Sequence, residues 1–179
     1  MSVGQLLQTV RDHLRTQLTL DFKSCGVQLN GVPPSTAGEF YVAIDEDGTE
    51  SVGGDDPVLN ERYRIVISIM RRAGKYPKDR QGDLLLRETE ALKSLEELER
   101  LVIKNIHAAW NLMATYNTNL GAPDATLGDT AILPLFCRGR GRTYTWTSPT
   151  EEPDMLYAWL RKDVRFSGMN RKQRLESMG

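Results

Sequence analysis

The stretch ERYRIVISIMR, from Glu61 to Arg71, decides the fold of this chain. Tyr63, Ile65, Ile67 and Ile69 occupy every second position, so their side chains share one face. The positions between them hold arginine, valine, serine and methionine. A period of two is typical of a β-strand with one face in a core. The run from Glu39 to Asp45 repeats the pattern with Phe40, Val42 and Ile44. We expect the two runs to pair as antiparallel strands.

Two segments have helical periodicity. Leucine and valine recur every three or four residues from Gln5 to Leu18, which predicts an amphipathic helix. A longer pattern begins at Asp83, a capping residue, and continues to about Asn117. A helix of that length measures roughly 45 Å at 1.5 Å per residue. We expect it to outreach a small sheet unless it bends or meets another subunit, with Trp110 or Trp159 at the centre of such a contact.

The remaining patterns predict short strands at Asp21–Leu29, Thr130–Phe136 and Arg142–Ser148, the last two joined by a basic hairpin at 137–141. Tyr157–Met169 alternates like a strand, although Pro153-Asp154 is also a possible helix start. The order predicts one α+β domain over residues 1–179, with a mainly antiparallel sheet and with an N-terminal helix and one long helix packed on one face.

Protruding loops are expected at three places in this domain, residues 45–60, 71–82 and 137–142, together with a basic C-terminal tail at 170–179. The first loop is rich in glycine and acidic residues, and the second is basic, so neither is suited to burial. We therefore expect all three loops to be solvated.

Charge and composition narrow the function classes. The 179 residues include 23 lysines and arginines against 24 aspartates and glutamates, so a surface built entirely for nucleic acid or anionic lipid is excluded. No apolar run approaches a membrane span, and Arg11, Asp12 and Arg15 interrupt the stretch that a signal peptide needs. Cys25 and Cys137 lie far apart, which predicts free thiols in a reducing compartment.

No pattern predicts a metal or cofactor. Counting Asp45 and Asp47 as the first and third positions of a calcium loop puts Glu50 where glycine is required. Gly74-Lys75 lacks the other residues of a phosphate-binding loop, and Gly139-Arg140-Gly141 lacks the third glycine of a dinucleotide fingerprint. We therefore expect neither a calcium site nor a nucleotide site.

Catalysis has one candidate pair, Cys137 with His107, because a nucleophilic cysteine needs a neighbouring base. The alternative, which the pattern favours, is that His107 is a hydrogen-bonded histidine beside the core. His13 is expected on the helix surface, and carboxylate pairs such as Glu96-Glu97 on an exposed helix face. We predict that the chain is not an enzyme.

Segregated charge is the strongest signal for a binding role. The segment 45–56, here called the acidic segment, contains no basic residue; the segment 71–80, here called the basic segment, contains one acid, Asp79. The acids are Asp45, Glu46, Asp47, Glu50, Asp55 and Asp56, and the bases are Arg71, Arg72, Lys75, Lys78 and Arg80. Opposite patches at different sites indicate a head-to-tail contact between copies, which can close into a ring. The alternative is two solvated loops that touch nothing.

Three further arginines, Arg138, Arg140 and Arg142, fall in the predicted hairpin near Tyr144 and Trp146. Arginines interleaved with aromatic residues favour contact with phosphates and bases that does not depend on sequence. We therefore consider them as lumen or DNA contacts.

The chain as a whole resembles the tail terminator and neck-type minor tail proteins of tailed bacteriophages. The resemblance lies in the opening helix Gln5–Leu18, the strand Glu61–Ile69 running into Arg71-Arg72, the long helix to Asn117, and the closing Val164–Met169. It implies a virion structural protein without enzymatic activity, assembled in the host cytoplasm and located at the tail or neck.

The resemblance also implies the partners. Six copies would form a ring that caps the tail tube, stops its polymerisation, and offers a surface to the head-side connector. The partners are then the chain itself, the tail tube protein and the connector, with non-specific contact to passing DNA and no membrane. A head-tail connector or head-completion protein is the alternative, and a small nucleic-acid-binding module or enzyme is a third.

Overall fold

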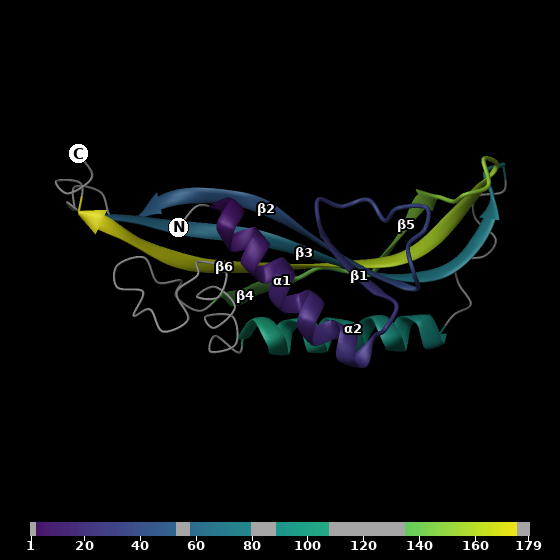
Figure 1. Cartoon of the computed structure of the whole chain (residues 1–179), viewed down its shortest axis with the longest axis horizontal. Helices are drawn as coiled ribbons and strands as arrows, with labels where there is room; N and C mark the ends of the chain where they lie inside the picture. Colours follow the sequence, from purple (N-terminus) through teal and green to yellow (C-terminus); the bar gives the residue numbers. More distant parts are fainter. Residues whose placement is uncertain (1–2, 53–57, 80–88, 108–134, 175–179) are drawn as a thin grey trace.

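The computed structural model describes residues 3–52, 58–79, 89–107 and 135–174. The elements follow in the order α1 Val3–Asp21, β1 Cys25–Leu29, β2 Phe40–Val52, β3 Val58–Pro77, α2 Thr89–His107, β4 Phe136–Arg140, β5 Tyr144–Pro149 and β6 Met155–Arg174. Figure 1 shows one long sheet with both helices on the same side. The predicted α+β class, with a mainly antiparallel sheet and helices on one face, is confirmed.

The sheet has the order β1-β2-β3-β6-β4, with β5 also paired to β6. The predicted pairing of the two alternating runs is confirmed, because Phe40 lies opposite Arg71 and Ile44 opposite Ile67 in antiparallel register. The short first strand forms as β1 and pairs with β2 in parallel. The connection from β1 to β2 therefore crosses over one face of the sheet.

The two longest strands are β3 and β6, each of 20 residues, which corresponds to roughly 66 Å at 3.3 Å per residue. They pair in antiparallel register from Val58 opposite Arg174 to Pro77 opposite Met155. The strand predicted at 157–169 is therefore confirmed, and Pro153-Asp154 lies in a turn. Arg171 and Arg174, expected in a loose tail, belong instead to β6.

Two of the predicted loops are largely strand. β2 continues to Val52 and β3 begins at Val58, so residues 45–52 of the acidic segment are paired with β3, with a register shift between Glu46 and Thr49. At the other end, β3 runs through most of the basic segment to Pro77. Backbone pairing explains both differences. Hydrogen bonds between paired strands keep charged residues extended even where the strand has no apolar face to bury.

The predicted hairpin at 137–141 is wrong. β4 pairs with β6 from Phe136 opposite Ser167 to Arg140 opposite Val164, and β5 pairs further along β6, from Tyr144 opposite Arg161. The two strands lie end to end along one edge of β6 instead of against each other. The chain therefore passes Arg138 and Arg140 along a sheet edge and does not turn back there.

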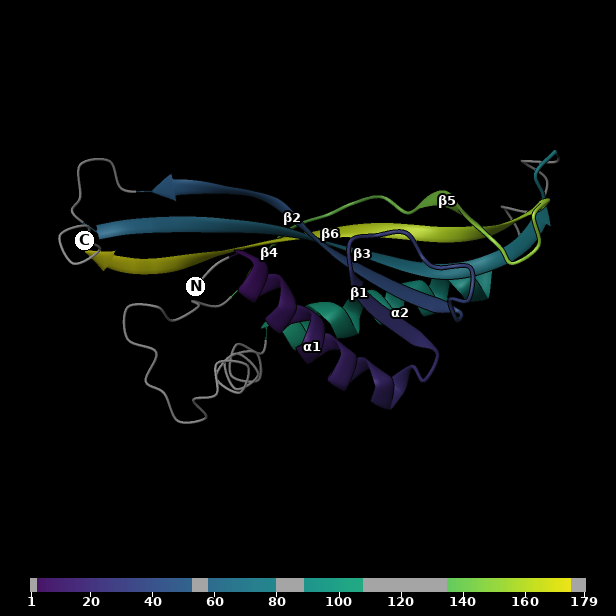
Figure 2. The same cartoon turned by 45° about the horizontal axis from the view of Figure 1, so that its top comes forward.

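Both helices cover the sheet face that carries the apolar side chains at odd positions of β3. One core joins the two helices to this face; it includes Leu6, Val10, Leu14, Leu18, Val42, Ile65, Ile67, Leu95, Leu98, Val102, Val164 and Phe166. The described part of α2 has 19 residues, or roughly 28 Å. The strands outreach the described parts of both helices at each end (Figure 2), and the predicted length of the second helix remains a prediction. Residues 83–88 and 108–117 of the predicted helix, Trp110 included, lie outside the described residues.

A smaller cluster lies on the face of the sheet that neither α1 nor the described part of α2 covers, here called the helix-free face. It consists of Tyr41, Ala43, Met70 and Trp159, with Ala37 packed against it from the β1–β2 connection. Trp159 is fully buried and its indole N–H donates to Ser148 Oγ at 2.8 Å. Trp159 is therefore part of the folded chain's own interior and not an exposed anchor for a second subunit.

His13 is buried, contrary to the surface position expected from sequence. The side chain is 2% exposed, and Nε2 lies 3.2 Å from the carbonyl oxygen of Asn105 on α2. Burial lowers its pKa, because the charged form loses hydration, and the hydrogen bond to Asn105 opposes this in part. The neutral imidazole is thus a link between the two helices.

The close approach of the β1–β2 connection to the chain before β1 depends on glycine at position 38. A Cβ added to Gly38 would lie 2.4 Å from the carbonyl oxygen of Ser24, whereas one added to Gly74 would meet nothing within 4 Å. We predict that Gly38→Ala lowers the free energy of unfolding by about 1–3 kcal/mol. The control Gly74→Ala should stay within about 0.5 kcal/mol of the parent. Urea unfolding measures both, and equal midpoints would contradict the packing described.

The buried His13 makes a pH-dependent contribution to stability. Its folded pKa lies below the ordinary value of 6.5, so the unfolded chain binds the proton more tightly. Its contribution is therefore complete above about pH 6.5 and is lost as the pH falls through the folded pKa. We predict that the urea midpoint of the parent falls below pH 6.5, and that His13→Gln makes this fall shallower. Parallel pH profiles of the two proteins would contradict the assignment.

Candidate functional site: an arginine-lined recess

The helix-free face holds a recess of about 350 Å³ beside Asp47 of the acidic segment. Its described lining is Asp47, Arg62, Arg64, Arg138, Arg165, Phe166 and Ser167. Four arginines and one acidic residue, Asp47, thus belong to the lining, among the side chains that the structure describes. We refer to this feature as the arginine recess.

Sheet register brings the recess together from three strands. Arg62 and Arg64 alternate with the core residues of β3, so their side chains lie on the helix-free face. Arg64 lies opposite Ser167, and Val66 opposite Arg165, which places β6 residues of the same face beside them. Arg138 of β4 lies two residues after Phe136, which is opposite Ser167, so it is on the same face as Ser167.

Two contacts hold lining residues of the recess to one another. Arg165 Nε lies 3.4 Å from Asp47 Oδ2, and Arg138 Nε donates to Ser167 Oγ at 2.6 Å. Arg165 and Asp47 are both partly exposed, at 53% and 38% of their side chains, so this ion pair adds little stability. Guanidinium groups present several donors in a plane that matches carboxylate and phosphate oxygens. The recess is therefore suited to an anion.

The three arginines expected together at a hairpin are separated in the structure. Arg138 faces the recess, whereas Arg140 binds Glu99 of α2 on the helix-covered face, and Arg142 is exposed beyond the end of β4. The register shift between Cys137 and Gly139 breaks the alternation of β4, so that Arg138 and Arg140 lie on opposite faces. A role of the three arginines as lumen or DNA contacts remains a prediction.

Glu99 fixes α2 to the sheet through two cations. Its carboxylate is fully buried; Oε2 lies 2.7 Å from Lys162 Nζ of β6, and Oε1 accepts from Arg140 of β4. Lys162 is 15% exposed and Arg140 58% exposed. A buried carboxylate needs such partners, because the loss of hydration is otherwise uncompensated.

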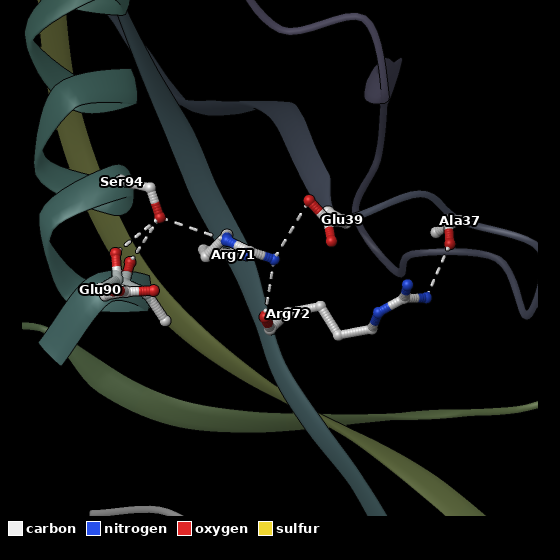
Figure 3. Close-up of polar contacts among 7 residues, drawn as sticks. Ala37, Glu39, Arg71, Arg72, Glu90 and Ser94 are labelled. Atoms are coloured by element: carbon white, nitrogen blue, oxygen red, sulfur yellow. Dashed lines mark hydrogen bonds and ion pairs between the residues drawn. The ribbon is translucent and has the colours of Figure 1, made fainter. Parts of the chain in front are cut away.

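The first two arginines of the basic segment bind within their own chain (Figure 3). Arg71 Nε donates to Ser94 Oγ of α2 at 3.2 Å, and its Nη1 lies 3.7 Å from Glu39 Oε2. Arg72 Nη1 donates to the carbonyl oxygen of Ala37 at 3.2 Å, on the other face of the sheet. These two arginines therefore do not form one patch.

The other predicted contact residues have mixed surroundings. Lys75 pairs with Glu152 of the β5–β6 turn, Lys78 is exposed, and Glu46 accepts from Thr49 Oγ1 at 3.3 Å. Asp45 is half-buried and helps to raise the pKa of Tyr41, after the larger effect of burial. Asp55, Asp56 and Arg80 lie outside the described residues. A role for any of these residues in contact between subunits remains a prediction.

The candidate catalytic pair is joined through the backbone. The Cys137 N–H donates to His107 Nε2 at 3.1 Å, and the imidazole meets the rings of Phe136 and Phe166 edge to face. This geometry fits the alternative of a hydrogen-bonded histidine beside the core. Cys25 and Cys137 are free thiols, as predicted, and burial raises the pKa of Cys25 to about 12.

In residues 3–52, 58–79, 89–107 and 135–174, histidine, cysteine and acidic side chains form no group of three that is suited to a metal. Neither described helix has the length and apolar character that crossing a membrane requires.

The recess itself could not be identified from sequence spacing. In the sequence, Arg62 and Arg64 alternate with core residues, as solvent-facing residues of any half-buried strand do. Arg138 and Arg165 come from segments about 75 to 100 residues away. The usable signal is the alternation within each strand, which puts Arg62 and Arg64 on the face opposite to the core residues of β3, and Arg165 on the face opposite to Val164 and Phe166. Only the register between the strands brings these arginines together.

The Glu99 ion pairs give a test of how α2 is held. We predict that Glu99→Gln lowers the free energy of unfolding by about 3–5 kcal/mol, because Lys162 keeps a largely buried charge without its partner. Glu96→Gln, at an exposed position on the same helix, is the matched control and should change stability by less than about 0.5 kcal/mol. Chemical denaturation measures both, and similar values for the two variants would rule out this role for Glu99.

Comparisons with known proteins complete the description. No protein-family model matches the chain, and no curated protein gives a significant match. Among solved structures, the chain is similar to one in a structure titled "Virion of native gene transfer agent (GTA) particle". The alignment covers 92% of this chain and 96% of that chain, at 16% sequence identity and a TM-score of 0.41.

Proposed function

We propose that this chain is a virion structural protein, a phage tail terminator that forms a homohexameric ring at the neck. The observation that carries the proposal is the long sheet, whose central strands project past both helices at each end (Figures 1 and 2). The resemblance of the whole chain to tail terminator and neck-type proteins supports the same assignment.

Unpaired strand edges are the physical reason to expect assembly. β1 pairs with β2 only as far as Ile44, so β2 from Asp45 to Val52 has one edge without a strand partner among the described residues. β4 begins opposite Ser167, so β6 from Gly168 to Arg174 is in the same position on the other side. Open edges accept further strands unless something covers them.

Two different open edges in one chain favour a closed ring. Contact between unlike surfaces of successive copies is heterologous. The assembly closes into a ring when a whole number of the rotations between copies makes one full turn. The ring would bind the end of the tail tube more favourably than a further tube subunit does, and its far face would differ from that end. Growth of the tube would then stop, and the far face would be available to the head-side connector.

This role requires surface complementarity and no bond chemistry. The partners are further copies of the chain, the tail tube protein and a head-side connector. The site of action is the tail or neck of the virion, after assembly in the host cytoplasm.

A deletion of the gene, followed by electron microscopy of the particles, tests this assignment. We predict tails of uncontrolled length, together with a ring of discrete mass when the purified chain is mixed with its cognate tail tubes. Tails of normal length beside unjoined heads would instead assign the chain to the head-tail connectors. A chain that stays monomeric beside the tube and binds DNA with a steep dependence on salt would indicate a nucleic-acid-binding module.

A further inference from the structure

We infer that the space between α1 and the outer edge of β1, here called the α1–β1 groove, binds an extended acidic segment of a partner protein. The segment adds a strand to the sheet, and two of its acidic residues contact Arg11 and Arg15 of α1. This inference goes beyond the proposed function, because strand addition at this edge does not require a ring.

The α1–β1 groove lies at the edge of the sheet. It has a volume of about 270 Å³, and its described lining is Arg11, Arg15, Val27, Gln28 and Leu29. Successive side chains of a strand point to opposite faces, so a space that touches three consecutive residues of β1 lies along the edge of that strand. β2 occupies the inner edge of β1. The groove is therefore at the outer edge, where α1 packs beside the strand (Figure 2).

The outer edge of β1 presents backbone hydrogen-bonding groups. The N–H of Asn30, directly after β1, donates to the carbonyl oxygen of Ile44 at 3.2 Å. Because the backbone groups of successive strand residues point to alternate sides, Gln28 also bonds toward β2, whereas Val27 and Leu29 direct their N–H and C=O groups outward. Among the residues that the structure describes, no strand pairs with that side. An extended segment satisfies such groups by adding a strand.

Two arginines of α1 stand beside these backbone groups. Arg15 is exposed and has no ion-pair partner in the described part of the chain. Arg11 binds Asp12 through Nε and Nη2, at 2.9 and 2.8 Å, which leaves the donors of Nη1 for another acceptor. The described lining of the groove includes both arginines and no acidic residue. Guanidinium groups form their strongest hydrogen bonds with carboxylates, so an acidic occupant is favoured.

The spacing of the two arginines decides which acids fit. Residues four apart on a helix are neighbours on one face, with Cβ atoms about 5–6 Å apart, and this applies to Arg11 and Arg15. Residues two apart on a strand also share a face, and they are separated by about 6.6 Å at 3.3 Å per residue. The two spacings match, whereas adjacent acids of a strand point to opposite faces. The occupant is therefore an extended segment with acids two positions apart.

Two other occupants are less suited to the groove. A nucleic acid offers phosphates to the arginines but has no peptide groups that pair with Val27 and Leu29. A second copy of this chain offers Asp45 and Asp47 of β2 at the required spacing, but Asp45 is half-buried and Asp47 already lies 3.4 Å from Arg165. A partner protein is therefore favoured, and the other two occupants are outcomes of the test.

Peptide binding to the full chain tests the inference. The probe is a fluorescein-labelled peptide of sequence TVETEVT, whose acids are two positions apart. One control, TVEETVT, has the same composition with adjacent acids, and a second control is the probe with methyl groups on two successive backbone nitrogens, which block strand pairing. Fluorescence anisotropy measures affinity. We expect the probe to bind at least about tenfold more tightly than either control, and to protect the amides of Val27 and Leu29 from hydrogen exchange.

Variants of the chain locate the binding site. Arg15→Gln should weaken binding of the probe about tenfold, because one charge-assisted contact is lost. Arg100→Gln, at an exposed position of α2, is the matched control and should bind like the parent. Circular dichroism establishes that both variants are folded. No binding of the probe, equal affinities for the probe and TVEETVT, or equal affinities of the parent and Arg15→Gln would each overturn the inference.

Two further measurements identify the competing occupants. A labelled single-stranded oligonucleotide is titrated in parallel, and tighter binding than that of the probe, lost in Arg15→Gln, would assign the groove to nucleic acid. Protection of Val27 and Leu29 without peptide, rising with the concentration of the chain, would assign it to a second copy. Either result would overturn the inference. All of these assays use the purified chain, so their outcome is separate from the tail lengths that test the proposed function.

Discussion

The antiparallel pairing of β3 with β6 is the interaction on which the rest of this structure depends. The pairing extends from Val58 opposite Arg174 to Pro77 opposite Met155. β2, β4 and β5 each pair with one of these two strands, and β1 pairs with β2. The register of this pair decides which side chains share a face. It therefore places Ile65, Ile67, Val164 and Phe166 under the helices and Arg62, Arg64 and Arg165 on the opposite face.

Two kinds of contact attach the helices to this strand pair. Apolar side chains of α1 and α2 pack on the covered face, and Glu99 adds a buried carboxylate held by Lys162 and Arg140. Because the Glu99 contacts reach both β6 and the edge strand β4, they link α2 to the side of the sheet farthest from β1. The described parts of the helices thus cover the middle of the sheet. Strand edges that have no strand partner among the described residues carry backbone donors and acceptors that other strands can satisfy.

The sequence predicted the parts of the fold that bury an apolar face. The alternation from Tyr63 to Ile69, the pairing with Phe40–Ile44 and the helical run from Leu6 to Leu18 all appear in the core. The extent of the strands was not predictable in the same way, because residues such as Glu50 and Arg62 are held extended by backbone pairing and carry no apolar signal. The burial of His13 was missed because a polar residue on a helix gives no sign of which helix will pack on it. The recess required the register between segments far apart in the chain, so spacing along the sequence could not reveal it.

The central claim is that the projecting ends of the sheet are assembly surfaces. Hydrogen–deuterium exchange of the isolated chain and of the chain in intact particles tests this claim directly, because exchange reports whether a backbone N–H has a partner. We predict fast exchange for the outward amides of Asp45–Val52 and Gly168–Arg174 in the isolated chain, and strong protection of the same amides in the particle. Equal exchange rates in the two states would contradict the account.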